Sequence, residues 1–361
     1  MGIVYKNFYS VCFLSNETLL MFKRGAFYIL DIPSSKFKKI AQIQFSFKEK
    51  IVHTLPLMAR IFRMGIRCGM KISDDIVLYV LKNKIYELNL TNGSISNGFS
   101  THDKSRPLIF TQIKKLVGFD KGIYFGGYLS NQKRQAVSIY KRVSKDKWNV
   151  VYEFPEGKIE HIHNIIADKY SNSVFILTGD FNQAAGIWIA KDNFSSVTPL
   201  LLGNQNYRAC VAYPTPKGLI YATDTPFTEN SIRILINTNE DKWISKKIQT
   251  INGPSIYGCE WNDEFIFSTS VEGDGRKQSI FYKLFGRKPG IGVKSDFSCV
   301  YKGDLEKGFK EIYRVRKDTR PFFLFQFGVL CFPSGINRSR YLPMFHIATK
   351  KHSMSTYIFE E

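Results

Sequence analysis

Apolar side chains occur along this chain in short runs rather than in long helical stripes. Segments with the 3.6-residue period of an amphipathic helix are almost absent, whereas short runs of β-branched and aromatic residues recur throughout. Glycine, asparagine, aspartate and proline separate many of these runs and supply turn chemistry. The pattern predicts an all-β protein.

One type of apolar run repeats at intervals of about 45 to 65 residues, which is close to the spacing of β-propeller blades. Its seven copies are Leu19–Phe22, Ile76–Tyr79, Gly122–Phe125, Ser173–Ile176, Gly218–Tyr221, Glu264–Phe267 and Val329–Phe332. Neighbouring runs supply the other strands of each four-stranded blade; around the sixth copy these are Ser279–Tyr282 and Cys299–Tyr301. We therefore expect a seven-bladed β-propeller. The irregular segment 307–361 leaves a six-bladed ring with an extra sheet as the alternative. No linker or low-complexity segment interrupts the chain, so a single domain over residues 1–361 is expected.

The stretch from Glu160 to Asp180 carries the strongest lead to function. It predicts a β-hairpin, with one strand starting at His161, turn residues from Asp168 to Ser173, and a second strand ending before Asp180. Because side chains alternate along a strand, His161 and His163 are expected on one face. Antiparallel pairing then brings Asp180 back to the same edge of the sheet.

Propeller geometry extends this argument to other blades, because first strands begin and second strands end on the same face of the ring. Residues expected to begin first strands are Arg63, Arg67, His161, His163, Tyr207, Arg208 and Tyr257. Residues expected just after second strands are Gly126-Gly127-Tyr128, Thr178-Gly179-Asp180 and Thr223-Asp224-Thr225. Arginine, histidine, carboxylate and tyrosine side chains are thus predicted to share one concave site.

The charge of the chain favours an anionic partner. Lys and Arg number 51 against 31 Asp and Glu, which gives a net charge of +20. A nucleic acid, an acidic membrane surface or an acidic glycan would each match this charge. The alternative is that the excess reflects nucleotide composition bias, since the chain is also rich in Ile and Asn.

The cysteines and the N-terminus indicate a soluble, cytoplasmic protein. The six cysteines are scattered, form no CxxC pair, and mostly lie in apolar runs, as expected of core thiols in a reducing compartment. The N-terminal residues lack the pattern of a signal peptide, and the longest apolar run, from Phe322 to Phe332, is too short to span a bilayer.

Several of these motifs, taken together and in order, resemble sialidase-like (BNR/Asp-box-type) β-propeller proteins, which often occur among bacterial surface-polysaccharide genes. The resemblance covers about residues 55 to 240. It rests on the runs Gly122–Tyr128, His161–His163, Thr178–Asp180, Tyr207-Arg208 and Thr223–Thr225. Ser144–Trp148 and Ala190–Asn193 are degenerate Asp-box turns without the glycine. Gly127 stands where the family pattern has an acidic residue.

The resemblance implies a substrate carboxylate held by an arginine cluster, with tyrosine and carboxylate groups doing the chemistry. Guanidinium groups suit carboxylates because they bind them through two hydrogen bonds. The expected substrate-binding residues are Arg63, Arg67, Tyr207, Arg208 and Tyr257. The expected catalytic residues are His161, His163, Asp180, Asp224 and Tyr128. Ordinary salt bridges and turn caps are the competing interpretations of the arginines and aspartates.

The two histidines allow three interpretations. As general acid–base groups they titrate near neutrality and could serve lysis beside a uronate carboxylate. As metal ligands they need a third donor, such as Asp180 or Asp224. Hydrogen-bonded structural histidines are the third interpretation. The sequence favours no cofactor, with a divalent metal at His161 and His163 as the less favoured alternative.

The sequence therefore predicts a carbohydrate-active propeller that binds an acidic oligo- or polysaccharide at the channel mouth and cleaves it by hydrolysis or elimination. The alternative is a non-enzymatic propeller that recognises a glycan or a protein, and Gly127 favours it. A specific nucleic-acid partner is not expected, and the oligomeric state is not predicted.

Overall fold

The computed structural model describes residues 2–238, 242–274 and 279–361 and contains seven antiparallel sheets in this part of the chain. Six sheets have four strands and one has three, and within six of them the strands follow one another in chain order. They are the blades of a seven-bladed β-propeller, so the predicted fold class is confirmed. The chain divides into two compact units, residues 1–98 with 257–361 and residues 99–256, which are described separately.

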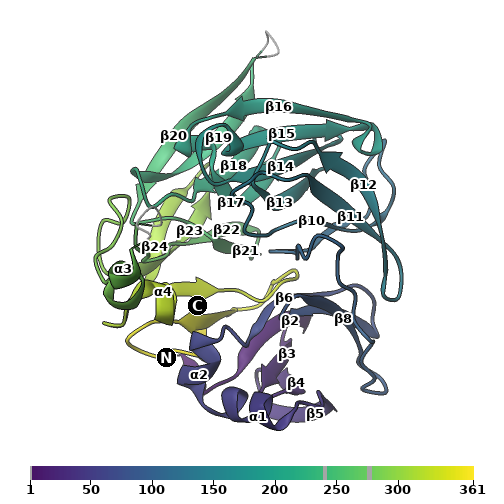
Figure 1. Cartoon of the computed structure of the whole chain (residues 1–361), viewed down its shortest axis with the longest axis vertical. Helices are drawn as coiled ribbons and strands as arrows, with labels where there is room; N and C mark the ends of the chain where they lie inside the picture. Colours follow the sequence, from purple (N-terminus) through teal and green to yellow (C-terminus); the bar gives the residue numbers. More distant parts are fainter. Residues whose placement is uncertain (1, 239–241, 275–278) are drawn as a thin grey trace. The chain divides into compact units, whose positions relative to one another are not determined.

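The unit of residues 99–256, called unit 2 below, holds three of the sheets (Figure 1). The first comprises β9 (Thr111–Ile113), β10 (Gly122–Gly126), β11 (Val137–Ser144) and β12 (Lys147–Phe154). The second comprises β13 (His161–Asp168), β14 (Ser173–Gly179), β15 (Gly186–Lys191) and β16 (Ser196–Leu202). The third comprises β17 (Ala209–Thr215), β18 (Gly218–Thr223), β19 (Asn230–Asn237) and β20 (Trp243–Ile251). Short 3-10 turns are η1 (Asn182–Ala184), η2 (Asp192–Phe194) and η3 (Gln205–Tyr207).

The remaining residues form unit 1, which holds four sheets. Two of these sheets are β2 (Tyr9–Ser15), β3 (Thr18–Lys23), β4 (Ala26–Asp31) with β5 (Lys36–Gln42), and β6 (Ile66–Lys71), β7 (Ile76–Leu81) with β8 (Lys84–Asn89). A third is β21 (Tyr257–Trp261), β22 (Glu264–Ser268), β23 (Phe297–Asp304) and β24 (Gly308–Arg316). The last joins β25 (Val329–Cys331), β26 (Tyr341–Ile347) and β27 (Ser355–Glu360) to β1 (Ile3–Tyr5).

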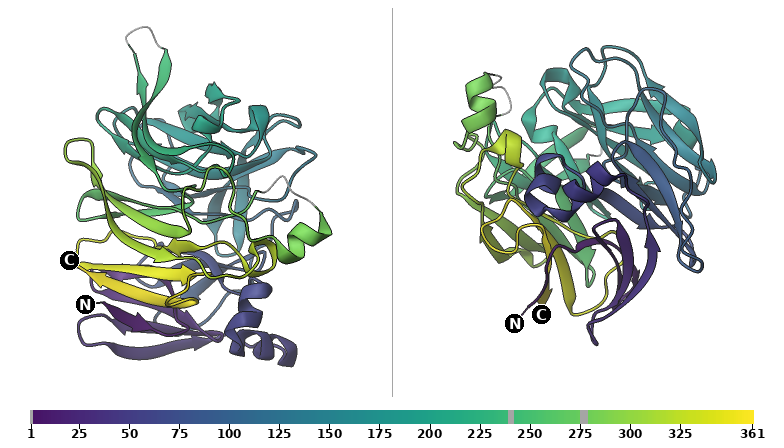
Figure 2. Two further views of the ribbon diagram at one scale, coloured as in Figure 1. Left: turned by 90° about the vertical axis from the view of Figure 1, so that its left-hand side faces the viewer. Right: turned by 60° about the horizontal axis from the view of Figure 1, so that its bottom comes forward.

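The two ends of the chain lie side by side in this last sheet (Figure 2). Its outermost strand comes from the N-terminus, since Ile3 pairs with Ile358. The sequence pattern assigns all seven copies of the repeat to the second strand of a blade, and for the seventh copy this is wrong: Val329–Cys331 is the first strand of its sheet, and the second strand is β26. The apolar composition of both strands explains the error.

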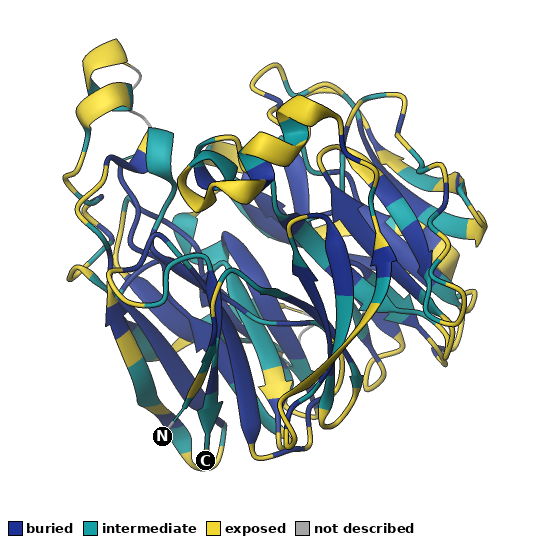
Figure 3. Cartoon of the chain, turned by 90° about the horizontal axis from the view of Figure 1, so that it is seen from below, coloured by how far each residue is buried: buried dark blue, intermediate teal, exposed yellow. Residues whose placement is uncertain are grey.

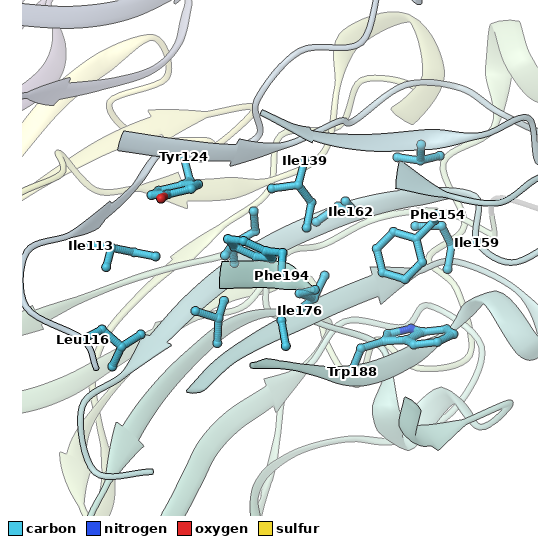
Figure 4. Packing of buried hydrophobic residues seen from close by; sticks show 14 residues of the cluster. Ile113, Leu116, Tyr124, Ile139, Phe154, Ile159, Ile162, Ile176, Trp188 and Phe194 are labelled. Carbon is cyan, nitrogen blue, oxygen red and sulfur yellow. The ribbon is translucent and has the colours of Figure 1, made fainter. Parts of the chain in front are cut away.

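The inner strands of unit 2, of which β14 is the clearest example, are buried on both faces, whereas the outermost strands β12, β16 and β20 are partly exposed. Along β14, Val174 and Ile176 belong to a core cluster with β9–β13, whereas Phe175 and Leu177 belong to one with β17 and β18. Figure 4 shows the first cluster, in which Trp188 and the other labelled side chains fill the space between sheets. A strand buried on both faces reads as a continuous apolar run, which is why the repeat is visible in the sequence.

The helices were not predicted, and all four described α-helices lie in connections of unit 1. They are α1 (Phe47–Thr54) and α2 (Pro56–Ile61) between β5 and β6, α3 (Ile280–Phe285) between β22 and β23, and α4 (Phe322–Phe325) between β24 and β25. The prediction of a strand at Ser279–Tyr282 is wrong: Ser279 is a helix N-cap whose side chain accepts a hydrogen bond from the Tyr282 amide. No described helix has the length and apolar character needed to cross a membrane.

Candidate functional site

The predicted hairpin is present as β13 and β14, and it positions the polar residues at one edge of its sheet. His161 pairs with Gly179 and Asp168 pairs with Ser173, so the strands begin and end where the sequence indicates. Asp180 directly follows Gly179, which places its carboxylate beside the start of β13. An irregularity in the pairing lies between Ile162 and Asn164, next to His163.

Two imidazoles and one carboxylate converge at this edge. His161 Nε2 lies 3.0 Å from His163 Nε2. Asp180 Oδ1 lies 3.1 Å from His163 Nε2 and 3.4 Å from His161 Nε2. Both histidines are buried, at 5% and 3% exposure, whereas the Asp180 side chain is 23% exposed. The three atoms therefore surround one point, and Asp180 gives that point its contact with solvent.

Backbone carbonyls from neighbouring sheets determine which ring nitrogens carry hydrogen. His161 Nδ1 lies 3.1 Å from the Leu129 carbonyl oxygen, and His163 Nδ1 lies 2.9 Å from the Ala209 carbonyl oxygen. A carbonyl oxygen only accepts hydrogen bonds, so each Nδ1 is the donor. In the neutral imidazole each Nε2 then carries a lone pair. Both lone pairs are directed toward the Asp180 carboxylate and toward each other.

Arg208 joins this group to a second carboxylate. Its Nη2 lies 3.2 Å from Asp180 Oδ1 and 3.5 Å from Asp224 Oδ2. Burial opposes ionisation of Asp180, but the Arg208 guanidinium, together with any proton that the two histidines hold toward the carboxylate, outweighs burial and keeps the pKa of Asp180 well below its ordinary value. Arg208 and Asp224 are both buried, so each stabilises a charge that would otherwise be costly.

Cys210 is a neighbour of this ion pair that sequence reasoning missed. Its thiol donates to Asp224 Oδ2 across 3.2 Å. Burial, together with the nearby Asp224 charge, raises the pKa of Cys210 well above its ordinary value, so the thiol stays protonated. The sequence offered only an apolar run around Cys210, which gave no signal for a polar contact.

The backbone around Asp180 is fixed on both sides. Its amide donates to Glu160 Oε2 across 2.8 Å, and its carbonyl oxygen accepts from Gln205 Nε2 across 2.9 Å. Half-exposed aromatic rings flank the group: Tyr128 lies 4.5 Å from the His161 ring, and Phe181 lies 5.5 Å from Phe227. The site is thus held by contacts to elements on three sheets of unit 2.

The structure brings together six of the predicted residues, all in unit 2. They are Tyr128, His161, His163, Asp180, Arg208 and Asp224. Tyr207 and Arg208 do not begin a strand as predicted. Tyr207 ends η3 and packs against the core cluster of β17 and β18, and Arg208 is the C-cap of η3, directly before β17.

Arg63, Arg67 and Tyr257 lie in unit 1. The prediction that Arg63 begins a strand is wrong, since it lies exposed in the turn after α2, before β6 begins at Ile66. Arg67 lies within β6, and Tyr257 begins β21. The roles proposed for these residues as binding groups stay predictions.

The His163 ring occupies the space beside Gly179 in which a side chain would lie. A Cβ at this position would lie 2.2 Å from the imidazole Cε1. We expect Gly179→Ala to displace His163 and to destabilise the fold by about 1–3 kcal/mol, as overpacking does. Chemical denaturation and the NMR shifts of the imidazoles measure both effects. Gly65→Ala, with nothing within 4 Å of its Cβ, is the control and should change neither.

No protein-family model matches the chain, and no curated protein matches it. Solved structures do resemble it. The β-propeller domain of Cps50 (Swd1) from Myceliophteria thermophila is 8% identical, covers 100% of both chains and has a TM-score of 0.58. An oligogalacturonate lyase from Vibrio parahaemolyticus is 11% identical, covers 99% of this chain and 91% of its own, and has a TM-score of 0.53. An oligogalacturonate lyase in complex with manganese is 10% identical, with 99% and 90% covered and a TM-score of 0.50.

At these identities the likeness establishes the fold. This chain is similar both to carbohydrate-active enzymes and to a propeller domain of another kind. The resemblance to sialidase-like propellers stays a prediction.

Proposed function

We propose that the group of His161, His163 and Asp180 binds a divalent metal ion, and that the ion and Arg208 together hold the carboxylate of an acidic saccharide, which the protein cleaves. The observation that carries this proposal is the convergence of two Nε2 lone pairs and a carboxylate oxygen on one point. Arg208 contacts Asp180 from one side, but with neither a metal ion nor a proton between them the two Nε2 lone pairs and the carboxylate oxygen would repel one another.

The distances fit shared coordination. Atoms that bind one metal ion at about 2.0–2.2 Å lie about 2.8–3.6 Å apart in tetrahedral or octahedral geometry. The three separations here are 3.0, 3.1 and 3.4 Å. Metal-binding histidines also usually donate the other ring N–H to a carbonyl or carboxylate, as His161 and His163 do. Two imidazoles with one carboxylate suit Zn²⁺, Mn²⁺ or Fe²⁺.

A proton held between the two rings is the competing explanation of the convergence. It would also relieve the repulsion, and it would leave the site without a metal. A direct titration with Mn²⁺ or Zn²⁺ separates the two explanations, because a site that holds only a proton takes up neither ion.

Charge connects the metal to the saccharide. With neutral histidines, Asp180, Asp224 and Arg208 carry one net negative charge, which would repel a uronate. A bound divalent ion would make the net charge of this group positive. The group could then attract an anionic ligand in spite of its two aspartates, whose charge Arg208 alone does not outweigh.

The proposed reaction is elimination beside the carboxylate. A base removes the proton at C5, the electron pair of that C–H bond forms the double bond between C4 and C5, the C4–O bond breaks, and the leaving oxygen takes up a proton, which balances the one lost from C5. When bound, the ion would withdraw charge from the carboxylate and so acidify the C5 proton. Arg208 would orient the carboxylate, and Asp180 would hold both in place. Tyr128, a partly exposed phenol whose ring lies tilted against the His161 ring with centroids 4.5 Å apart, is assigned the proton transfer to the leaving oxygen.

The neighbouring structures support this substrate class. Two of them are oligogalacturonate lyases, and one of these is in complex with manganese. Oligogalacturonate is an acidic saccharide. The net charge of +20 on this chain favours binding of such an anionic ligand. Hydrolysis of a sialylated saccharide, which the sequence resemblance implies, is the alternative reaction.

The test uses the whole protein, first depleted of metal with a chelator and then loaded with Mn²⁺. Each form is incubated with oligogalacturonate and with sialylated oligosaccharides. We expect the ultraviolet absorbance of an unsaturated uronate to rise with the loaded form and to disappear after chelation. New reducing ends without that absorbance would indicate hydrolysis. Absence of Mn²⁺ and Zn²⁺ binding in calorimetry would contradict the metal site, and saccharide binding without any product would support a non-enzymatic glycan-binding propeller.

A further inference from the structure

The four α-helices of unit 1 form a connected row on one side of that unit. In this row α1 contacts α2, α2 contacts α4, and α4 contacts α3. In Figure 3, which colours the chain by burial, α1 and α3 are mostly exposed, whereas α2 and α4 are partly buried. The helices belong to three separate connections, so the chain returns repeatedly to build one surface.

This surface, called the helical patch, carries large apolar side chains that point away from the core. Six of them are more than half exposed: Phe47 (78%), Phe62 (56%), Ile280 (77%), Phe281 (75%), Phe285 (57%) and Phe323 (57%). The helices and the residues next to them hold ten of the twenty exposed large hydrophobic side chains in the described part of the chain. Such a concentration on a folded protein indicates an interaction site.

Buried polar contacts fix the patch to the sheets. Arg60 of α2 is 3% exposed, and its Nη2 lies 3.3 Å from Asp318 Oδ1. Arg60 also donates to the Phe325 carbonyl oxygen at α4, and the Gln326 side chain donates back to the Arg60 carbonyl oxygen. The helices are therefore held in place beneath their exposed apolar side chains.

Positive charge surrounds the apolar side chains. Lys48, Lys50 and Arg63 are exposed on or next to α1 and α2, and Arg287 and Lys288 follow α3. Within α1 and α2 the single acidic residue is Glu49, which pairs with Lys82 and the Ser46 cap. The charge pattern therefore suits an anionic partner.

A cavity of about 380 Å³ adjoins α4 and the segment that follows α3, and its lining, like the helical patch, carries an excess of positive charge. Its charged lining residues are Arg287, Arg316, Lys317, Arg320, Lys350, Asp296 and Asp318. Asp296 lies 3.2 Å from Arg316, and Asp318 lies 3.1 Å from Lys317, so each carboxylate is neutralised within the lining. The excess of cations makes this cavity suitable for a phosphate group.

We propose that the helical patch docks on a membrane surface that contains anionic phospholipid. The exposed phenylalanines enter the boundary between headgroups and acyl chains, the flanking cations contact anionic headgroups, and the basic cavity takes a lipid phosphate. A second copy of this chain is a poorer occupant, because it would place like charges against each other. Nucleic acid would match the charge but leave the helical aliphatic and aromatic side chains exposed.

The experiment is flotation of the full-length protein with vesicles of phosphatidylcholine, with and without about 30% phosphatidylserine. We expect binding to the anionic vesicles and weaker binding at high salt, because salt screens exposed charges. The double variant Phe281→Ser, Phe285→Ser should lower the affinity on the order of tenfold or more, and Arg287→Glu with Lys288→Glu should do the same. Val117→Ser, an equally exposed side chain in unit 2, is the matched control and should bind as the wild type does.

Failure of the wild type to bind anionic vesicles at low salt would overturn the proposal. So would vesicle binding that both double variants retain. If the protein instead self-associates in analytical ultracentrifugation and Phe281→Ser, Phe285→Ser abolishes that association, the patch is a self-association surface and membrane docking is rejected. The substituted side chains are exposed, and thermal unfolding of each variant verifies that the fold is kept.

Discussion

Asp180→Asn is expected to reduce Mn²⁺ affinity by roughly a hundredfold or more and to abolish saccharide cleavage. Asparagine keeps the size of the side chain but removes the negative charge that faces both Nε2 atoms, 3.1 and 3.4 Å away. Calorimetric titration with Mn²⁺ measures the first effect without reference to a substrate. The fold should persist, because Arg208 keeps its contact with Asp224.

The matched control for this substitution is Asp120→Asn. Asp120 also lies in unit 2 and forms a 2.7 Å ion pair with Lys141, but its side chain is 59% exposed. Exposed ion pairs contribute little, so this variant should bind Mn²⁺ as the wild type does. An Asp180→Asn protein with wild-type Mn²⁺ affinity would refute the assignment of Asp180 as a ligand.

A pH series on metal-free protein tests the electrostatics of Asp180 separately. Its pKa in the folded protein is lower than in the unfolded chain, so the ionised carboxylate stabilises the fold above the unfolded pKa. That stabilisation is lost as pH falls through the folded pKa. The difference in unfolding free energy between wild type and Asp180→Asn should therefore be largest near neutrality and shrink below about pH 4. A difference that grows on acidification would contradict this.

The sequence was sufficient to predict the parts of the site that depend on local rules. Strand alternation and turn chemistry place His161, His163 and Asp180 together, and the structure has them within 3.4 Å of one another. Local sequence rules could not predict which carbonyl oxygens accept hydrogen bonds from the two histidines. Leu129 and Ala209 belong to other sheets, so only the packing of sheets reveals that both Nδ1 atoms are donors.

Other predictions were wrong where the local composition is compatible with both a strand and a helix. Ser279–Tyr282 has the aromatic and β-branched character of a strand, yet the Ser279 cap starts a helix. Arg63 was placed at a strand start because the α1–α2 connection carries no strong helical pattern. Both errors fall in unit 1, in connections where the repeat that identifies the blades gives no information.

Arg208→Met is expected to destabilise the protein by about 3–5 kcal/mol, the usual cost of leaving one partner of a buried ion pair behind. Asp224 is 4% exposed, and Arg208 lies 3.5 Å from its Oδ2, while the Cys210 thiol is only a weak donor to it. A loss of this size lowers the melting temperature by roughly 5–15 °C. Scanning calorimetry measures it, and unchanged stability would show that Arg208 does not neutralise Asp224.

The double variant Arg208→Met, Asp224→Asn separates this structural role from ligand binding. Asparagine removes the uncompensated charge and still accepts the Cys210 thiol, so the pair of substitutions should cost clearly less than Arg208→Met alone, a coupling that a double-mutant cycle measures. Saccharide affinity should not recover, because the guanidinium that would hold the substrate carboxylate is still missing. Loss of that charge-assisted contact costs about 1.5–3 kcal/mol, or roughly ten- to a hundredfold in affinity. A stable double variant with wild-type saccharide affinity would exclude Arg208 from the binding site and leave it a purely structural residue.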